Sequence, residues 1–285
     1  MHVSEATRPA LEAQTTAPRR IDLRTRGRPH GPIVRLVSPS DVGERIKPFV
    51  FLDYIDVDAA SAPRFGFHPH SGIATLSLLF EGGFAFEDST GAAGVMEDGA
   101  VEWMQAGGGV WHTSTGTGKR GRGYQLWVAL PPALENSPAR SQYLDKACFE
   151  SRGPARVILG EHLGARSPIA SPGALNLLDV RLRAGQRWRY EPPAGHDVAW
   201  LAVHQGRAQV PELVAAGELV VFEDGDAPIS VVAEGDTSFI LGSAVKHPHD
   251  LVLGYYSVHT SAQALEKGEE GIRRIGEDLR RGGRL

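Results

Sequence analysis

The chain of 285 residues is 41% apolar, which is enough to bury a substantial core and excludes a disordered or collagen-like protein. Its 30 basic and 34 acidic residues are fairly evenly mixed and give a formal net charge of -4. That balance offers no broad cationic surface, so we expect no direct nucleic-acid partner. The lone cysteine, Cys148, excludes an internal disulfide and favours a reducing compartment.

The sequence has no apolar stretch of signal-peptide length near its start, and none that approaches the about 20 residues of a membrane span. We therefore expect a cytoplasmic protein without a membrane attachment. Residues 1–20 mix Ser, Thr, Ala, Pro and Arg without periodicity, and we expect them to form a disordered leader.

A first block of short strands is predicted between residues 21 and 135, where apolar or alternating segments are separated by Gly-containing turns. The predicted strands are Ile33–Val37, Phe49–Tyr54, Gly72–Phe80, Gly83–Glu87, Ala100–Met104, Val110–Ser114 and Tyr124–Leu130. Short strands at this even spacing indicate a barrel or jelly roll. We expect residues 21–135 to form an N-terminal lobe.

A second block of similar strands follows residues 136–150, which lack strand periodicity and are predicted to be a linker. Its strands are Arg156–Leu159, Leu175–Leu182, Ala199–Val203, Glu218–Phe222, Ile229–Ala233 and Ser238–Gly242. Residues 262–279 change to a spacing near 3.6, which predicts an amphipathic helix. We expect an all-β protein of two like lobes, with residues 151–285 forming the second lobe and a short C-terminal helix.

The chemistry of the chain is predicted to lie in a group of histidines in the first lobe. His68 and His70 are two residues apart, so on a strand both point to one face, about 6.5 Å apart along the chain. His112 follows the glycine turn at residues 107–109 and can reach them in a closed barrel. Three neutral imidazoles suit Fe, Ni, Cu or Zn. The alternative is a pair of strand-end histidines whose hydrogen bonds are satisfied within the protein.

Several ordered motifs resemble one family and cover most of residues 30–275. They are Pro48-Phe49-Val50-Phe51-Leu52-Asp53, His68-Pro69-His70-Ser71-Gly72, Glu87-Asp88-Ser89-Thr90-Gly91, Glu102-Trp103-Met104-Gln105-Ala106-Gly107-Gly108-Gly109 with His112, and Gln125-Leu126-Trp127-Val128. This pattern resembles the pirin family of the cupin superfamily.

The resemblance implies a bicupin, in which two β-sandwich barrels face each other and a metal is bound in the N-terminal barrel only. Family members resemble quercetin 2,3-dioxygenases, and the animal type member is an iron-binding nuclear co-regulator of transcription. His68, His70 and His112 fall on the family's histidine ligand positions. The family's glutamate ligand falls on Ser114, whose hydroxyl is a poor ligand, so metal binding is expected to be weaker or absent.

No other carboxylate occupies a ligand position of the motif. The position four after His70 is Ala74, and we expect neither Glu87 nor Glu102 to be a ligand. The resemblance favours iron, with Ni, Cu or Zn as alternatives. No catalytic residue and no organic cofactor is assigned.

The resemblance, together with these residues, implies two alternative functions. The first is a metal-dependent dioxygenase acting on a flavonol-like or other small enolic or aromatic compound. The alternative is a catalytically degenerate pirin-like protein that regulates a protein partner by contact. Retention of three histidines favours the first, whereas Ser114 favours the second, and the oligomeric state stays open.

Other aromatic and histidine residues have less specific interpretations. Trp103, Trp111 and Trp127 are candidates for an aromatic pocket, although large aromatic residues in a small barrel are more often core. A second His-Pro-His at residues 247–249 is predicted to be a surface or interdomain turn, because Pro248 and Asp250 disfavour a regular strand.

Overall fold

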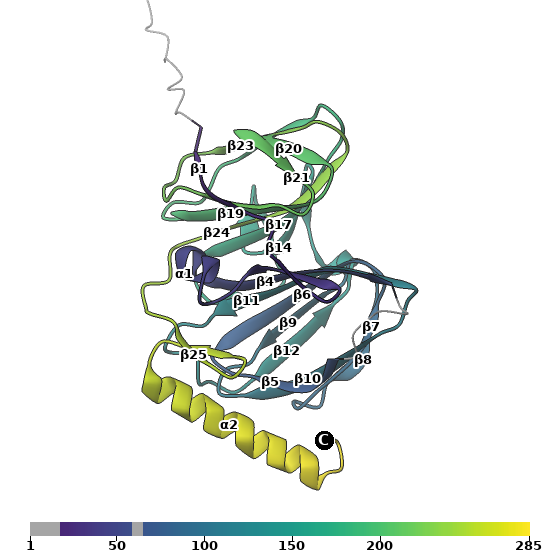
Figure 1. Ribbon diagram of the computed structural model, residues 1–285, viewed down its shortest axis with the longest axis vertical. Helices are drawn as coiled ribbons and strands as arrows, with labels where there is room; N and C mark the ends of the chain where they lie inside the picture. Colours follow the sequence, from purple (N-terminus) through teal and green to yellow (C-terminus); the bar gives the residue numbers. More distant parts are fainter. Residues whose placement is uncertain (1–17, 59–64) are drawn as a thin grey trace, which may run out of the picture.

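The structure is a computed structural model that describes residues 18–58 and 65–285. Residues 1–17, most of the expected leader, lie outside the described residues. Two β lobes are stacked along the long axis of the molecule, and the C-terminal helix lies along the outer side of the first lobe (Figure 1). The expected architecture of two β lobes and a C-terminal helix is confirmed.

The first lobe is built from two antiparallel sheets. Its seven-stranded sheet has the order β12 (Arg140–Leu144), β9 (Val101–Gln105), β6 (Ile73–Glu81), β11 (Arg120–Ala129), β4 (Phe49–Asp58), β3 (Ile33–Val37) and β2 (Arg28–His30). Its four-stranded sheet has the order β5 (Phe65–His70), β10 (Val110–Gly116), β7 (Phe84–Asp88) and β8 (Ala93–Met96).

The second lobe repeats this plan. Its seven-stranded sheet has the order β1 (Ile21–Thr25), β22 (Leu219–Phe222), β19 (Val198–Gln205), β24 (Thr237–Ala244), β17 (Leu175–Leu182), β14 (Ala155–Leu159) and β13 (Ser151–Arg152). Its four-stranded sheet has the order β18 (Arg187–Tyr190), β23 (Ile229–Ala233), β20 (Arg207–Val210) and β21 (Glu212–Ala215). A small pair, β15 (Glu161–His162) and β16 (Ala165–Arg166), completes the lobe.

The two seven-stranded sheets share one apolar core. Trp200 on β19 and Leu126 on β11 belong to the same cluster of buried side chains, and the Trp200 ring meets the edge of Phe49 at 5.4 Å. The next residue on β19, Leu201, belongs to a different cluster inside the second lobe. Strands such as β19 are thus buried on both faces, which explains the run of six apolar residues from Val198 to Val203.

The interiors of the two lobes differ. Large side chains that are almost fully buried, including Tyr190, Phe222 and Phe239, fill the second lobe. The first lobe instead encloses a cavity of about 430 Å³. Cavities of this size bind small molecules, so the hollow lobe is the natural place for a site.

The C-terminal segment consists of β25 (Val252–Gly254), β26 (Ser257–His259) and α2 (Ala262–Arg281). Helix α2 contacts β10 and β26, and the indole Nε1 of Trp111 donates to the carbonyl of Ile272 at 2.9 Å. Two short helical segments, α1 (Val42–Ile46) and η1 (Lys146–Cys148), lie elsewhere. Among residues 18–58 and 65–285, no helix combines the length and the apolar character that a membrane crossing needs.

Three segments are placed differently from the expected lobe boundaries. Strand β1 pairs with β22 of the second lobe although residues 21–25 were expected in the first. Strand β12 lies within the expected linker, 136–150, and pairs with β9. Helix α2 packs on the first lobe although it follows the second in sequence. Local patterns define the strands and the helix, but long-range pairing decides which lobe they join.

Candidate metal centre

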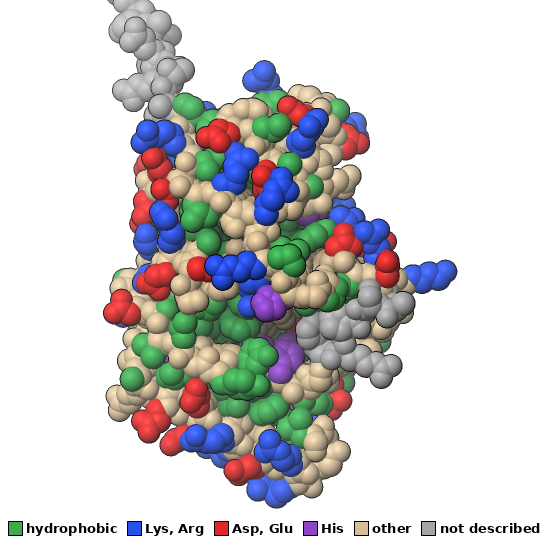
Figure 2. All heavy atoms as spheres, viewed as in Figure 1, with side chains coloured by type: hydrophobic (Ala, Val, Ile, Leu, Met, Phe, Trp, Pro, Cys, Tyr) green, Lys and Arg blue, Asp and Glu red, His purple; other side chains and the backbone are tan. Residues whose placement is uncertain are grey.

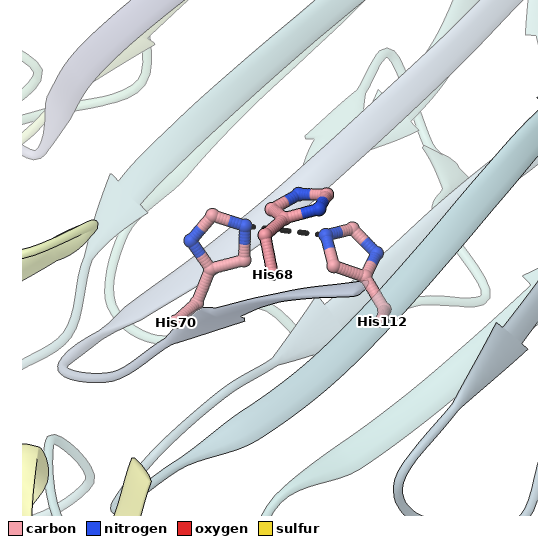
Figure 3. A group of neighbouring side chains, drawn as sticks. All are labelled: His68, His70 and His112. Carbon is pink, nitrogen blue, oxygen red and sulfur yellow. Dashed lines mark hydrogen bonds between the residues drawn. The ribbon is translucent and has the colours of Figure 1, made fainter. Parts of the chain in front are cut away.

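Neighbouring strands bring the three predicted histidines together. His68 and His70 lie on β5, and His112 lies opposite His68 in the antiparallel pairing of β5 with β10. Each imidazole offers one nitrogen, and these three nitrogens lie within 4.8 Å of one another (Figure 3). Gly107 begins the turn before β10. Its φ of +53 and the carbonyl oxygen of Ser137, which would lie 2.0 Å from an added Cβ, explain why this turn needs glycine. The predicted gathering of the histidines is therefore present in the structure.

The Nδ1 atom of each imidazole faces an oxygen acceptor. Nδ1 of His68 lies 2.9 Å from the carbonyl oxygen of Gly66, and Nδ1 of His70 lies 3.1 Å from that of Tyr256. Nδ1 of His112 lies 3.5 Å from Oε1 of Glu102. Because a carbonyl oxygen can only accept, we assign the protons of the neutral His68 and His70 rings to Nδ1. The Nε2 atoms of these two rings then carry a lone pair.

The Nε2 atoms of His70 and His112 face each other at 3.2 Å (Figure 3). This contact is a hydrogen bond in which one Nε2–H donates to the other ring, and a metal ion between the two nitrogens would take the place of the shared proton. Metal–nitrogen bonds of about 2.0–2.1 Å place two ligand nitrogens about 2.9–3.4 Å apart. The spacing of this pair fits that requirement, and the three histidines together could hold a metal ion.

Burial keeps the imidazoles of His68 and His70 in the neutral form that binds metal. Burial, and then the nearby His112, lower the pKa of His68 to about 4. Burial is also the largest cause that lowers the pKa of His70 well below its usual value. Metal ions bind neutral imidazole, so these two side chains need lose no proton at neutral pH.

The cavity beside the histidines has an aromatic wall and contains the Arg35–Asp53 ion pair. Phe51 and Trp127 stack with ring centroids 4.0 Å apart, and the Trp127 ring also meets the edge of His70 at 5.1 Å. Arg35 lies over Phe51 at 4.0 Å and donates to Asp53, with an Nη2–Oδ2 distance of 3.0 Å. Figure 2 shows histidine side chains in a hollow of the first lobe with apolar side chains around it.

The predicted tryptophan candidates and the second His-Pro-His lie in different parts of the structure. Trp127 lines the cavity, whereas Trp103 packs in the core shared by the lobes and Trp111 contacts α2. The second His-Pro-His, residues 247–249, lies outside any strand, and Nε2 of its His247 lies 3.3 Å from the carbonyl oxygen of Leu130.

The carboxylates near the site also differ in their positions. Ser114 lines the cavity, and Glu87 instead pairs with Arg284. Glu102 is only 2% exposed and lines the cavity beside His112. Alternation along β9 places Glu102 on the face opposite Trp103, and this signal could have located it in the barrel interior. The carbonyl of Tyr256 could not be found from sequence, because a main-chain contact leaves no motif.

Comparisons with known proteins define the family. A family model described as Pirin matches residues 33–128. A Pseudomonas aeruginosa protein named "Putative quercetin 2,3-dioxygenase" is 30% identical over 263 residues, which cover 84% of this chain and 91% of that protein. The chain belongs to the pirin family. The resemblance found in the motifs is thereby confirmed.

Solved structures support the same pirin-like fold. A quercetin 2,3-dioxygenase from Acinetobacter baumannii is similar with a TM-score of 0.77 and 23% identity, covering 94% of this chain and 97% of that one. A bacterial pirin from Escherichia coli, solved in complex with nickel(II), has a TM-score of 0.64 and 18% identity, covering 81% of this chain and 99% of that one. At these identities the likeness establishes the fold alone.

Proposed function

We propose that His68, His70 and His112 hold a divalent transition metal, iron in the first place, and that the chain is a dioxygenase for a small enolic or aromatic compound. The observation that carries the proposal is the convergence of three imidazoles, with Nε2 of His70 and of His112 facing each other, at the wall of a cavity of about 430 Å³. The names of two relatives support quercetin-like flavonols as the first compounds to test. Nickel in a bacterial pirin keeps Ni²⁺ among the candidate metals, with Cu²⁺ and Zn²⁺.

The bound metal would supply a Lewis acid that polarises a substrate hydroxyl and a centre able to react with dioxygen. The protein's own contribution is to hold the imidazoles rigidly. The carbonyls of Gly66 and Tyr256 orient the rings of His68 and His70 through their Nδ1 atoms. Such fixed rings keep the ligand geometry without a cost in side-chain entropy when the metal binds.

The cavity walls suit a flat apolar substrate. The stacked pair of Phe51 and Trp127 offers an aromatic surface close to His70. Such a surface excludes water and orients a planar ring by stacking. The Arg35–Asp53 ion pair gives the same cavity a polar region for substrate hydroxyl groups.

A regulatory protein that acts by contact is the second candidate function. Ser114 at the family's glutamate position favours it, because three imidazoles without that carboxylate bind metal less tightly. In this case the cavity would hold little metal, and a protein partner would recognise the outer surface.

Metal content and turnover distinguish the two functions. We would measure metal by elemental analysis in untagged protein, comparing the unaltered chain with a His68→Ala/His70→Ala double variant. A His247→Ala/His249→Ala variant is the matched control, since it alters the other His-Pro-His sequence. Near-stoichiometric metal lost only in the first variant, with flavonol consumed under oxygen, supports the dioxygenase. No metal after reconstitution with Fe, Ni, Cu and Zn would contradict it and favour the regulator.

A further inference from the structure

We propose that Glu102 is the carboxylate of this centre and that it acts through His112, supplying the negative charge that Ser114 lacks. The inference rests on the proposed metal site. It assigns Glu102 as a positioning residue, because the carboxylate faces the ring nitrogen directed away from the other two histidines.

The imidazole of His112 lies between the Glu102 carboxylate and the position of the proposed metal. Oε1 of Glu102 lies 3.5 Å from Nδ1 of His112, and Nε2 of the same ring faces His70 at 3.2 Å. Glu102 is 2% exposed and His112 is 4% exposed, so water screens this contact little. A carboxylate behind a ligand histidine fixes the ring and increases the basicity of its metal-binding nitrogen.

Glu102 is held in place by the adjacent strand. Ser77 on β6 pairs with Glu102 on β9 in the antiparallel register, and its Oγ donates to Oε2 at 2.6 Å. Oε1 is then left to face His112. The two carboxylate oxygens thus have different tasks, one in anchoring and one in orienting the ring.

The charge on Glu102 has no Lys or Arg partner among the ion pairs of the described residues, where its one basic neighbour is His112. Burying a carboxylate beside neutral groups is costly unless a cation compensates it. A divalent ion bound by Nε2 of His112 would provide that compensation through the ring. A cation at the histidine group thus explains why a carboxylate is buried at Glu102. Glu102 would supply this charge from a different strand than the one that carries Ser114.

The test compares Glu102→Gln with the unaltered protein, using Glu87→Gln as a control because Glu87 pairs with Arg284 instead. Glutamine keeps the shape and an acceptor oxygen but removes the charge. We would measure the dissociation constant for Ni²⁺ by chelator competition, and the unfolding temperature of each metal-free protein. Proton NMR of the Ni²⁺ protein would follow the exchangeable, paramagnetically shifted Nδ1 protons of the ligand histidines.

We expect Glu102→Gln to weaken Ni²⁺ binding by about 10–100-fold and to move one of three Nδ1 proton signals. The metal-free Glu102→Gln variant should be at least as stable as the unaltered protein, because a buried charge has been removed. Glu87→Gln should change neither the Ni²⁺ affinity nor the Nδ1 proton signals. Ser77→Ala, which frees Oε2, should move the same proton signal as Glu102→Gln.

Three results would overturn the inference. Unchanged Ni²⁺ affinity and proton signals in Glu102→Gln would remove any role for Glu102 while leaving the three-histidine site intact. Weaker binding with all three Nδ1 signals unmoved would make Glu102 a direct ligand instead of a positioning residue. Failure of the unaltered protein to bind Ni²⁺, Fe²⁺, Cu²⁺ or Zn²⁺ would overturn the proposed function as well.

Discussion

The carbonyl oxygen of Tyr256 lies 3.1 Å from Nδ1 of His70, a residue 186 positions earlier in the chain. The next residue, Ser71, meets the same C-terminal segment, because its Oγ lies 2.9 Å from Nε2 of His259. Nδ1 of His259 in turn lies 3.3 Å from Glu135. The C-terminal segment therefore supports the strand that carries two of the three histidines.

Gly268→Ala should destabilise the protein by about 1–3 kcal/mol, because an added Cβ would lie 2.4 Å from Nε2 of His259 and 2.6 Å from Oγ of Ser71. The sign is informative, since Gly→Ala inside a helix ordinarily stabilises by about 1 kcal/mol. Urea unfolding gives the measurement, with the exposed Glu266→Ala on the same helix as a control. A stabilised Gly268→Ala would show that α2 does not pack tightly on Ser71.

Ser114→Glu should bind divalent metal about tenfold more tightly or better, because it restores a carboxylate beside three imidazoles. Without metal the same change places an uncompensated charge in the cavity and should lower the unfolding temperature. Adding Ni²⁺ should therefore raise that temperature more in the variant than in the unaltered protein. An equal rise in both proteins would mean that the new carboxylate does not reach the metal.

Arg35→Met should cost about 2 kcal/mol at pH 7, because it leaves Asp53 buried without its cation. Burial raises the pKa of Asp53, and Arg35 opposes that rise. Without Arg35 the pKa should rise further, so the variant loses stability as pH increases through that pKa and is least impaired near pH 4. Unfolding curves at pH 4 and pH 7 test this, and Asp53→Asn in the same variant should recover most of the loss.

His204→Phe should make stability less dependent on pH in mildly acidic solution. The His204 ring stacks on Phe80 between the lobes, with centroids 4.0 Å apart, and burial lowers its pKa to about 3. The unfolded chain takes up this proton below about pH 6.5. As the pH falls from about 6.5 to 3, the free energy of unfolding therefore decreases by up to about 1.4 kcal/mol per pH unit because of this residue. Urea unfolding at pH 7, 6 and 5 should show a shallower slope in the variant.

The exposed His249→Asn serves as the control for this titration and should keep the slope of the unaltered protein. Parallel stability curves for His204→Phe and the unaltered chain would mean that the His204 ring is protonated in the native state at the same pH as in the unfolded state.

Sequence patterns predicted the two lobes and the histidines because both leave local signals. Alternation and glycine turns define strands such as Ile33–Val37, which the structure reproduces as β3. The spacing of His68 and His70 fixed their common face, and the pairing of β5 with β10 placed His112 beside them. The family motifs indicate which of the chain's histidines belong to the metal-binding group.

Contacts between distant strands were not predictable in the same way. Nothing local to Tyr256 indicates that its carbonyl meets His70, since any residue has a carbonyl. Glu102 occupies no ligand position of the motif, so the motif does not indicate it, and its burial beside His112 depends on the register of β6 with β9. Lobe membership of β1 likewise depends on pairing with β22, almost 200 residues away.

The exchange of terminal segments makes the two lobes mutually dependent. Strand β1 precedes the first lobe but completes the large sheet of the second, whereas β25, β26 and α2 follow the second lobe but pack on the first. Cutting the chain between residues 145 and 150 would thus give two fragments that each lack a part carried by the other. Neither half would be an independent module, so the pair of lobes must be expressed, and exchanged with relatives in chimaeras, as one piece.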